Sequence, residues 1–129
     1  MAQAHGLPSW LYKRLKKDWP EQLEQLTQTL KQTAPLTLRV NTRQISRDDY
    51  LEILQEQEIA AETCTVSEVG IVMLQNVHIP DLPGFDEGIF SVQDEHAQLC
   101  AMLLPNLDGK VVVDACAAPG GKTAHLLEK

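Results

Sequence analysis

The chain has 129 residues, of which 43% are hydrophobic and only 5% aromatic, so its core must rest on Leu, Val, Ile and Ala. This hydrophobic share excludes a disordered chain. A formal net charge of −7 argues, taken alone, against a nucleic-acid binder, because phosphate contacts need Lys and Arg. The charge is uneven, however. Residues 1–47 hold eight bases and three acids (net +5), and residues 48–129 hold three bases and fifteen acids (net −12). A basic arm is therefore joined to an acidic body.

The three cysteines, Cys64, Cys100 and Cys116, are odd in number, with no C-x-x-C spacing and no nearby His pair. This pattern supports neither a disulfide framework nor a zinc site, and no other metal is predicted. Cys64 and Cys100 fall on a strand and on the apolar face of a helix, so we expect both in the core. Reduced thiols predict a cytoplasmic protein. No membrane span or secretory signal is predicted, since no apolar run approaches ~20 residues.

The first segment, residues 8–32, has leucines at helical spacing and an interruption at Pro20. It predicts two short helices, with Pro20 in the first turn of the second. The basic side chains here either form a solvated face or contact RNA phosphates, and the sequence leaves both readings open. The candidate RNA contacts, including two from the next segment, are Lys13, Arg14, Lys16, Lys17, Arg39 and Arg43.

Residues 36–88 predict a small α+β domain of order β-α-β-β. "PLTLRVNT" alternates apolar and polar residues, as a half-buried strand does. Ser46, with Asp49 three residues later, predicts the start of a helix whose buried stripe is Tyr50, Leu51, Ile53 and Leu54. "ETCTV" and "GIVMLQN" predict a hairpin, and the Pro- and Gly-rich "HIPDLPGFDEG" a loop.

The last segment, residues 89–129, begins with a strand at Ile89 and continues as a helix from Gln93 that ends before Pro105. "KVVVDA", residues 110–115, is a continuous apolar run typical of a strand buried in a parallel sheet. "GGKTAHLLEK" predicts a further helix, with His125 at its surface or end.

The glycine turn in "DACAAPGGKT" fails two familiar phosphate-binding patterns. A P-loop needs a glycine where Cys116 stands, and Pro119 removes one backbone N–H from the middle of the loop. A G-x-G-x-x-G fingerprint fails because the only glycines, Gly120 and Gly121, are adjacent. What remains is a turn of small residues after an apolar strand, where a ligand can approach the backbone. Asp114 either caps this turn or accepts a hydrogen bond from a ligand amine.

"DACAAPGGKT", preceded by "FSVQDEHAQL" and "LRVNT", resembles the S-adenosylmethionine-dependent RNA (cytosine-5) methyltransferases. Within them it is most similar to the bacterial 16S ribosomal RNA methyltransferase B subgroup, over residues 8–129. The resemblance implies an α/β protein in which a small α+β (RRM-like) RNA-binding subdomain is followed by the first strand and helices of a truncated Rossmann-like methyltransferase domain. The implied divisions are 1–35, a helical basic linker; 36–88, the RNA-binding subdomain; and 89–129, the start of the methyltransferase domain.

The same resemblance implies a cofactor, a partner and a set of site residues. S-adenosylmethionine would be bound at the turn, with 16S ribosomal RNA as the substrate. The implied cofactor-binding residues are Cys116, Ala117, Ala118, Pro119, Gly120, Gly121 and Lys122. The resemblance implies that the family's nucleophilic and product-releasing cysteines lie in P-C and T-C dipeptides of motifs that follow the glycine turn. No P-C occurs here, and the one T-C, Thr63-Cys64, precedes that turn, so no catalytic residue is assigned in this chain.

We therefore expect the chain to be an internal fragment of such an enzyme and to be inactive alone. Two further readings remain. In one, the chain is a non-catalytic RNA-binding module, which would bind RNA with steep salt dependence and no S-adenosylmethionine. In the other, the apolar strand at residues 110–115 pairs with its equivalent in a second copy and causes non-native self-association.

Overall fold

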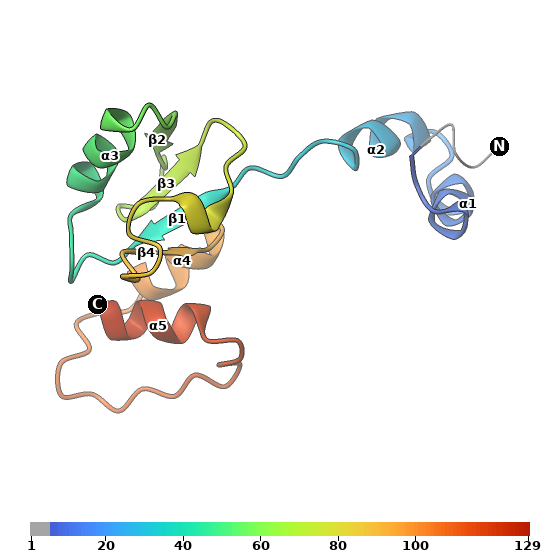
Figure 1. Cartoon of the computed structure of the whole chain (residues 1–129). Helices are drawn as coiled ribbons and strands as arrows, with labels where there is room; N and C mark the ends of the chain where they lie inside the picture. Colours follow the sequence, from blue (N-terminus) through green and yellow to red (C-terminus); the bar gives the residue numbers. More distant parts are fainter. Residues whose placement is uncertain (1–5) are drawn as a thin grey trace. The chain divides into compact units, whose positions relative to one another are not determined.

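The computed structural model describes residues 6–129 and divides the chain into two units, Met1–Ala34 and Pro35–Lys129. In the first unit, the helices α1 (Ser9–Asp18) and α2 (Leu23–Thr29) confirm the two predicted helices (Figure 1). Pro20 was predicted in the first turn of the second helix. In the structure it lies in a turn that precedes α2.

The second unit is built on a four-stranded antiparallel sheet of order β2-β3-β1-β4 (Figure 1). Its strands are β1 (Thr37–Val40), β2 (Ala61–Thr63), β3 (Gly70–Met73) and β4 (Phe90–Val92). The predicted hairpin is confirmed as the β2–β3 pair, in which Thr63 lies opposite Ile71. In the central strand β1, Leu38 lies opposite Ile71 on β3 and Val92 on β4. The predicted small α+β domain is confirmed, and β4 adds a fourth strand to it.

Helix α3 (Arg47–Glu56) covers one face of this sheet and closes the main core. The predicted cap is confirmed, since the Ser46 hydroxyl accepts a hydrogen bond from the Asp49 N–H at 3.1 Å. The Tyr50 hydroxyl donates to the Pro83 carbonyl at 2.9 Å, so the buried phenol keeps a partner. The core cluster comprises Leu38, Val40, Tyr50, Leu54, Ile71, Met73, Leu82 and Phe90. The loop between β3 and β4 contributes Leu82 and contains the 3-10 turn η2 (Ile79–Asp81).

Strand β1 is buried on both faces, whereas its alternating sequence predicts one exposed face. Leu38 and Val40 belong to the core under α3. The alternate residues Thr37 and Arg39 point away from that core, because successive side chains of a strand lie on opposite faces. Helices α4 (Glu95–Met102) and α5 (Gly121–Glu128) lie beside this second face, and Arg39 bonds to α5. The prediction that one face of β1 is exposed was wrong, because the helices that cover this face lie far from β1 in the sequence.

Helix α4 is attached to the sheet through polar groups. The fully buried Gln98 amide donates to the carbonyls of Leu38 at 3.3 Å and Gln93 at 2.9 Å, and accepts from the Ser67 hydroxyl. The Glu95 carboxylate accepts from the backbone N–H groups of Val66 at 2.6 Å and Ser67 at 2.9 Å. These two hydrogen bonds lower the pKa of Glu95. Together these hydrogen bonds hold α4 against strand β1 and against the loop between β2 and β3.

The predicted strand at residues 110–115 is absent from the described chain, where this segment is irregular. Val111 is 96% exposed and Val113 is 83% exposed. A strand forms only when a neighbouring strand accepts and donates its backbone hydrogen bonds. The pairs of the described sheet are β2–β3, β3–β1 and β1–β4, and no strand of this sheet pairs with the apolar run. The prediction was wrong because it assumed a parallel sheet around the run.

Candidate cofactor site

The glycine turn connects the irregular segment to α5 and is held at both ends by Asp114. One carboxylate oxygen of Asp114 accepts from the Cys116 N–H at 3.0 Å, and the other accepts from the Thr123 hydroxyl at 2.7 Å. These bonds, together with the charge of Lys122, lower the pKa of Asp114, so its carboxylate is ionised at neutral pH. The capping role of Asp114 is thereby confirmed, and it ties the start of the turn to the first turn of α5.

Gly120 forms the N-cap of α5 with a φ of 109°, in the region that favours glycine. A Cβ atom at this position would lie more than 4 Å from the surrounding atoms, so there is room for a side chain. The positive φ is therefore the reason for the glycine. The seven residues predicted to bind a cofactor, Cys116 to Lys122, form one continuous turn and the first residues of the helix. Of these, Gly120 is half-buried and the others are exposed.

A pocket of about 260 Å³ lies beside the turn, between α4, α5 and residues 112–115. Its polar lining includes Asp114 and Lys122, and its apolar lining includes Val112, Leu104 and Leu126. A carboxylate and an ammonium group suit the ammonium and carboxylate of an amino-acid ligand, and the apolar side chains suit its carbon chain. The donor set therefore fits the methionine part of S-adenosylmethionine. The volume is just under the roughly 300–1,000 Å³ of whole-ligand pockets.

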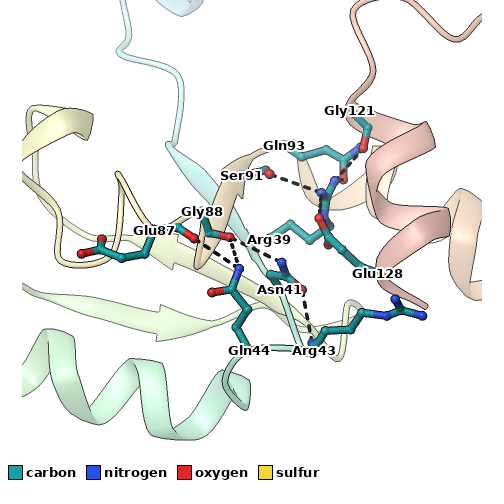
Figure 2. A network of polar contacts seen from close by, with 10 residues as sticks. All are labelled: Arg39, Asn41, Arg43, Gln44, Glu87, Gly88, Ser91, Gln93, Gly121 and Glu128. Carbon is teal, nitrogen blue, oxygen red and sulfur yellow. Dashed lines mark hydrogen bonds and ion pairs between the residues drawn. The ribbon is translucent and has the colours of Figure 1, made fainter.

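Arg39 joins the helix that follows this turn to the sheet (Figure 2). Its guanidinium donates to Gln93 Oε1 at 2.7 Å, to the Gly121 carbonyl at 2.7 Å and to Ser91 Oγ at 3.3 Å. It also binds both carboxylate oxygens of Glu128, at 3.0 and 2.7 Å. Arg39 is fully buried. The predicted RNA contact of Arg39 is therefore corrected, since every polar group it presents faces the protein interior.

The remaining predicted RNA contacts lie in both units and are exposed. Lys13, Lys16 and Lys17 lie on α1, whose last turn contains the latter two. Arg14, also on α1, forms an ion pair with Asp18. Arg43 follows β1, and its backbone N–H donates to the Asn41 side chain at 3.2 Å (Figure 2). The structure leaves the side chains of the three lysines and Arg43 at the surface, where phosphate can reach them.

Two further expectations concern the burial of side chains. Cys100 was expected in the core, but it is exposed, although it lines the pocket beside the turn. His125 was expected at the surface or at the end of its helix; it lies in the last turn of α5 but is only 7% exposed, and its Nδ1 has no hydrogen-bond partner among the described residues. Burial, and then the charge of Arg39, lower the pKa of His125 and keep it neutral. Burial raises the pKa of the Cys64 thiol to about 11, so this thiol is no nucleophile at neutral pH.

Within residues 6–129 the structure contains no group of three or more His, Cys, Asp or Glu side chains placed to hold a metal ion. Over the same residues, no helix is long and apolar enough to cross a membrane.

The fold and the site together define an α+β domain of ferredoxin-like topology, followed by a glycine turn and a helix. A sequence profile described as the ferredoxin-like domain of RsmF/B-like methyltransferases matches residues 7–80, which is more than half of the chain. The chain therefore belongs to the RsmF/B-like methyltransferase family, and the resemblance found in its sequence is confirmed.

Individual relatives agree with this assignment. The chain is 51% identical, over 121 residues and 94% of its length, to a protein of Pseudomonas syringae pv. tomato named ribosomal RNA small subunit methyltransferase B. It is 44% identical, again over 121 residues and 94% of its length, to a protein of the same name from Serratia proteamaculans. It spans only 27% and 28% of the lengths of these relatives. A crystal structure titled as a methyltransferase homolog from Pyrococcus horikoshii matches 97% of this chain and 41% of its own, with a TM-score of 0.71 and 25% identity.

Proposed function

We propose that this chain forms part of an enzyme that transfers a methyl group from S-adenosylmethionine to C5 of a cytosine in 16S ribosomal RNA. The curated relatives that it resembles are named as ribosomal RNA small subunit methyltransferases. The observation that carries the proposal is the glycine turn, held by Asp114 at the start of α5 beside a pocket that contains a carboxylate and an ammonium group.

In this proposal the turn from Cys116 to Lys122 holds the cofactor, which supplies an activated methyl group when bound. Asp114 keeps the turn in position through its two hydrogen bonds and faces the ligand ammonium. Lys122, at the first turn of α5, faces the ligand carboxylate, which the positive end of the helix dipole also favours. No residue of this chain is assigned the nucleophilic attack on the cytosine.

We further propose that residues 36–88 form the RNA-binding subdomain, that residues 1–35 are a basic linker and that residues 89–129 begin the methyltransferase domain, whose first strand, β4, pairs with β1 of the subdomain. The exposed Lys13, Lys16, Lys17 and Arg43 are the proposed phosphate contacts. On the face of β1 that carries Arg39, helix α5 and the residues after β4 bind the guanidinium. Because this face of the sheet is covered, RNA would contact the exposed side chains elsewhere on the subdomain. The proposed location is the cytoplasm.

Calorimetric titration of the full-length protein separates this proposal from that of a non-catalytic RNA-binding module. We expect S-adenosylmethionine to bind with a measurable heat, and RNA to bind with an affinity that falls steeply as salt increases. Binding of RNA without any binding of S-adenosylmethionine would contradict the enzyme proposal and favour the module.

A further inference from the structure

The guanidinium of Arg39 uses its full hydrogen-bonding capacity within the protein. A guanidinium has five N–H donors in a rigid fork. Arg39 makes five hydrogen bonds, to Ser91 and Gln93 near β4 and to Gly121 and Glu128 on α5, the last of which takes two (Figure 2). A fully buried charge is tolerated when it is paired and all its donors are satisfied. The arrangement is therefore a complete connection between the sheet and α5.

The two residues that Arg39 contacts on α5 lie near opposite ends of this helix. Gly121 is its first residue, and Glu128 is its last, two turns later. With the buried His125 between them, they form a stripe at spacings of four and three on one helix face. The side chain of a helical residue leans toward the helix N-terminus, so Glu128 extends back toward the guanidinium that also binds the Gly121 carbonyl. One side chain thus fixes both the start and the rotation of α5.

The Gly121 carbonyl belongs to the proposed cofactor turn. The residue before it, Gly120, is the N-cap of α5, and Thr123 two residues later is bonded to Asp114. A displacement of α5 would therefore move the turn. The opposite end of α5 is held separately, since the Lys129 ammonium donates to the carbonyls of Ala101 and Leu104 at the end of α4.

We infer that Arg39 is a positioning residue that holds the cofactor turn in register with the ferredoxin-like sheet, through its bonds to Gly121 and Glu128. The inference rests on the proposed function and deepens it. Strand β1 leads to the exposed Arg43, which is a proposed RNA contact. The Arg39 side chain connects this strand to the proposed cofactor turn. Arg39 itself touches neither ligand. Its removal leaves Glu128 without its charged partner beside the sheet and releases the first turn of α5.

Hydrogen–deuterium exchange of the full-length protein, followed by mass spectrometry, tests this connection directly. We expect Arg39→Ala and Glu128→Ala each to speed exchange in peptides that cover residues 121–128 by at least tenfold. Peptides that cover β3, residues 70–73, should keep their wild-type exchange. The double variant should exchange no faster than Arg39→Ala alone, because both substitutions remove the same interaction. Arg39→Lys should restore little, since an ammonium group lacks the planar fork.

A matched control comes from another helix of the same unit. Glu56→Ala removes an exposed glutamate from the last turn of α3. This substitution should not change exchange at residues 121–128. If Arg39→Ala or Glu128→Ala does not fold, Glu128→Gln decides the question, because the glutamine side chain removes the charge but keeps its size and one acceptor oxygen for the guanidinium; it should still speed exchange of α5. Unchanged protection of α5 in Glu128→Ala, or equally faster exchange of β3, would overturn the inference.

The affinity for S-adenosylmethionine is measured on the same variants by calorimetry. We expect a dissociation constant at least fivefold higher in Glu128→Ala and unchanged in Glu56→Ala. Faster exchange of α5 with unchanged affinity would overturn the link between Arg39 and the turn. A wild-type protein that binds no S-adenosylmethionine would contradict the proposed function instead, and the exchange measurement would still show whether Arg39 holds α5.

Discussion

Replacing Leu54 with alanine is expected to lower the free energy of unfolding by about 3 kcal/mol, within the range of roughly 2–5 kcal/mol found for buried leucines. Leu54 is fully buried on α3 and belongs to the cluster between this helix and the sheet. Its truncation removes the apolar contacts of the side chain and leaves a cavity in this cluster. A urea titration of the chain measures the loss.

The probe for this titration matters, because both tryptophans, Trp10 and Trp19, lie in the first unit. Far-ultraviolet circular dichroism, which includes α3 and the sheet, is the suitable signal. Leu103→Ala is the matched control: Leu103 is 84% exposed, and its loss should change stability by less than about 0.5 kcal/mol. Equal effects of the two substitutions would mean that the described core is not the one that stabilises the protein.

Replacing Asp114 with alanine is expected to weaken binding of S-adenosylmethionine by the full-length protein at least tenfold. The substitution removes the acceptor of both the Cys116 N–H and the Thr123 hydroxyl, so the turn loses its connection to α5. It also removes the carboxylate proposed to face the ligand ammonium. Asp114→Asn keeps an acceptor for one of the two bonds and should lose less affinity. Isothermal titration calorimetry gives the three dissociation constants.

Asp86→Ala serves as the control for this experiment, because Asp86 is an exposed aspartate in the loop between β3 and β4. Its affinity should equal that of the wild type. A dissociation constant of Asp114→Ala within twofold of the wild-type value would show that the turn does not depend on this carboxylate, and the proposed cofactor site would have to lie elsewhere.

Local sequence signals predicted most of the small domain. The Ser46 cap, the apolar spacing of α3 and the short β2–β3 hairpin each depend on residues close together in the chain. The fold class followed from their order. The glycine turn and α5 were also predictable, because Gly120 and Gly121 precede a run with helical spacing.

Contacts between distant residues were not predictable in the same way. The alternation of β1 places Arg39 on a polar face, and the sequence gives no sign that Glu128, 89 positions later, covers it. The same helix buries His125, for which the sequence predicted a place at the surface or at the end of this helix. Residues 110–115 have the composition of a buried strand, but a strand also requires a neighbour, which composition does not reveal. The sequence therefore predicts which residues could form a site more readily than it predicts which side chains will meet.

Transfer of a labelled methyl group from S-adenosylmethionine to unmodified 16S ribosomal RNA by the full-length protein tests the central proposal most directly. The label should appear in the RNA, and digestion of the product to nucleosides should locate it in 5-methylcytidine. RNA that remains unlabelled when the protein binds both ligands, or a label found on another base or on the ribose, would contradict the proposal.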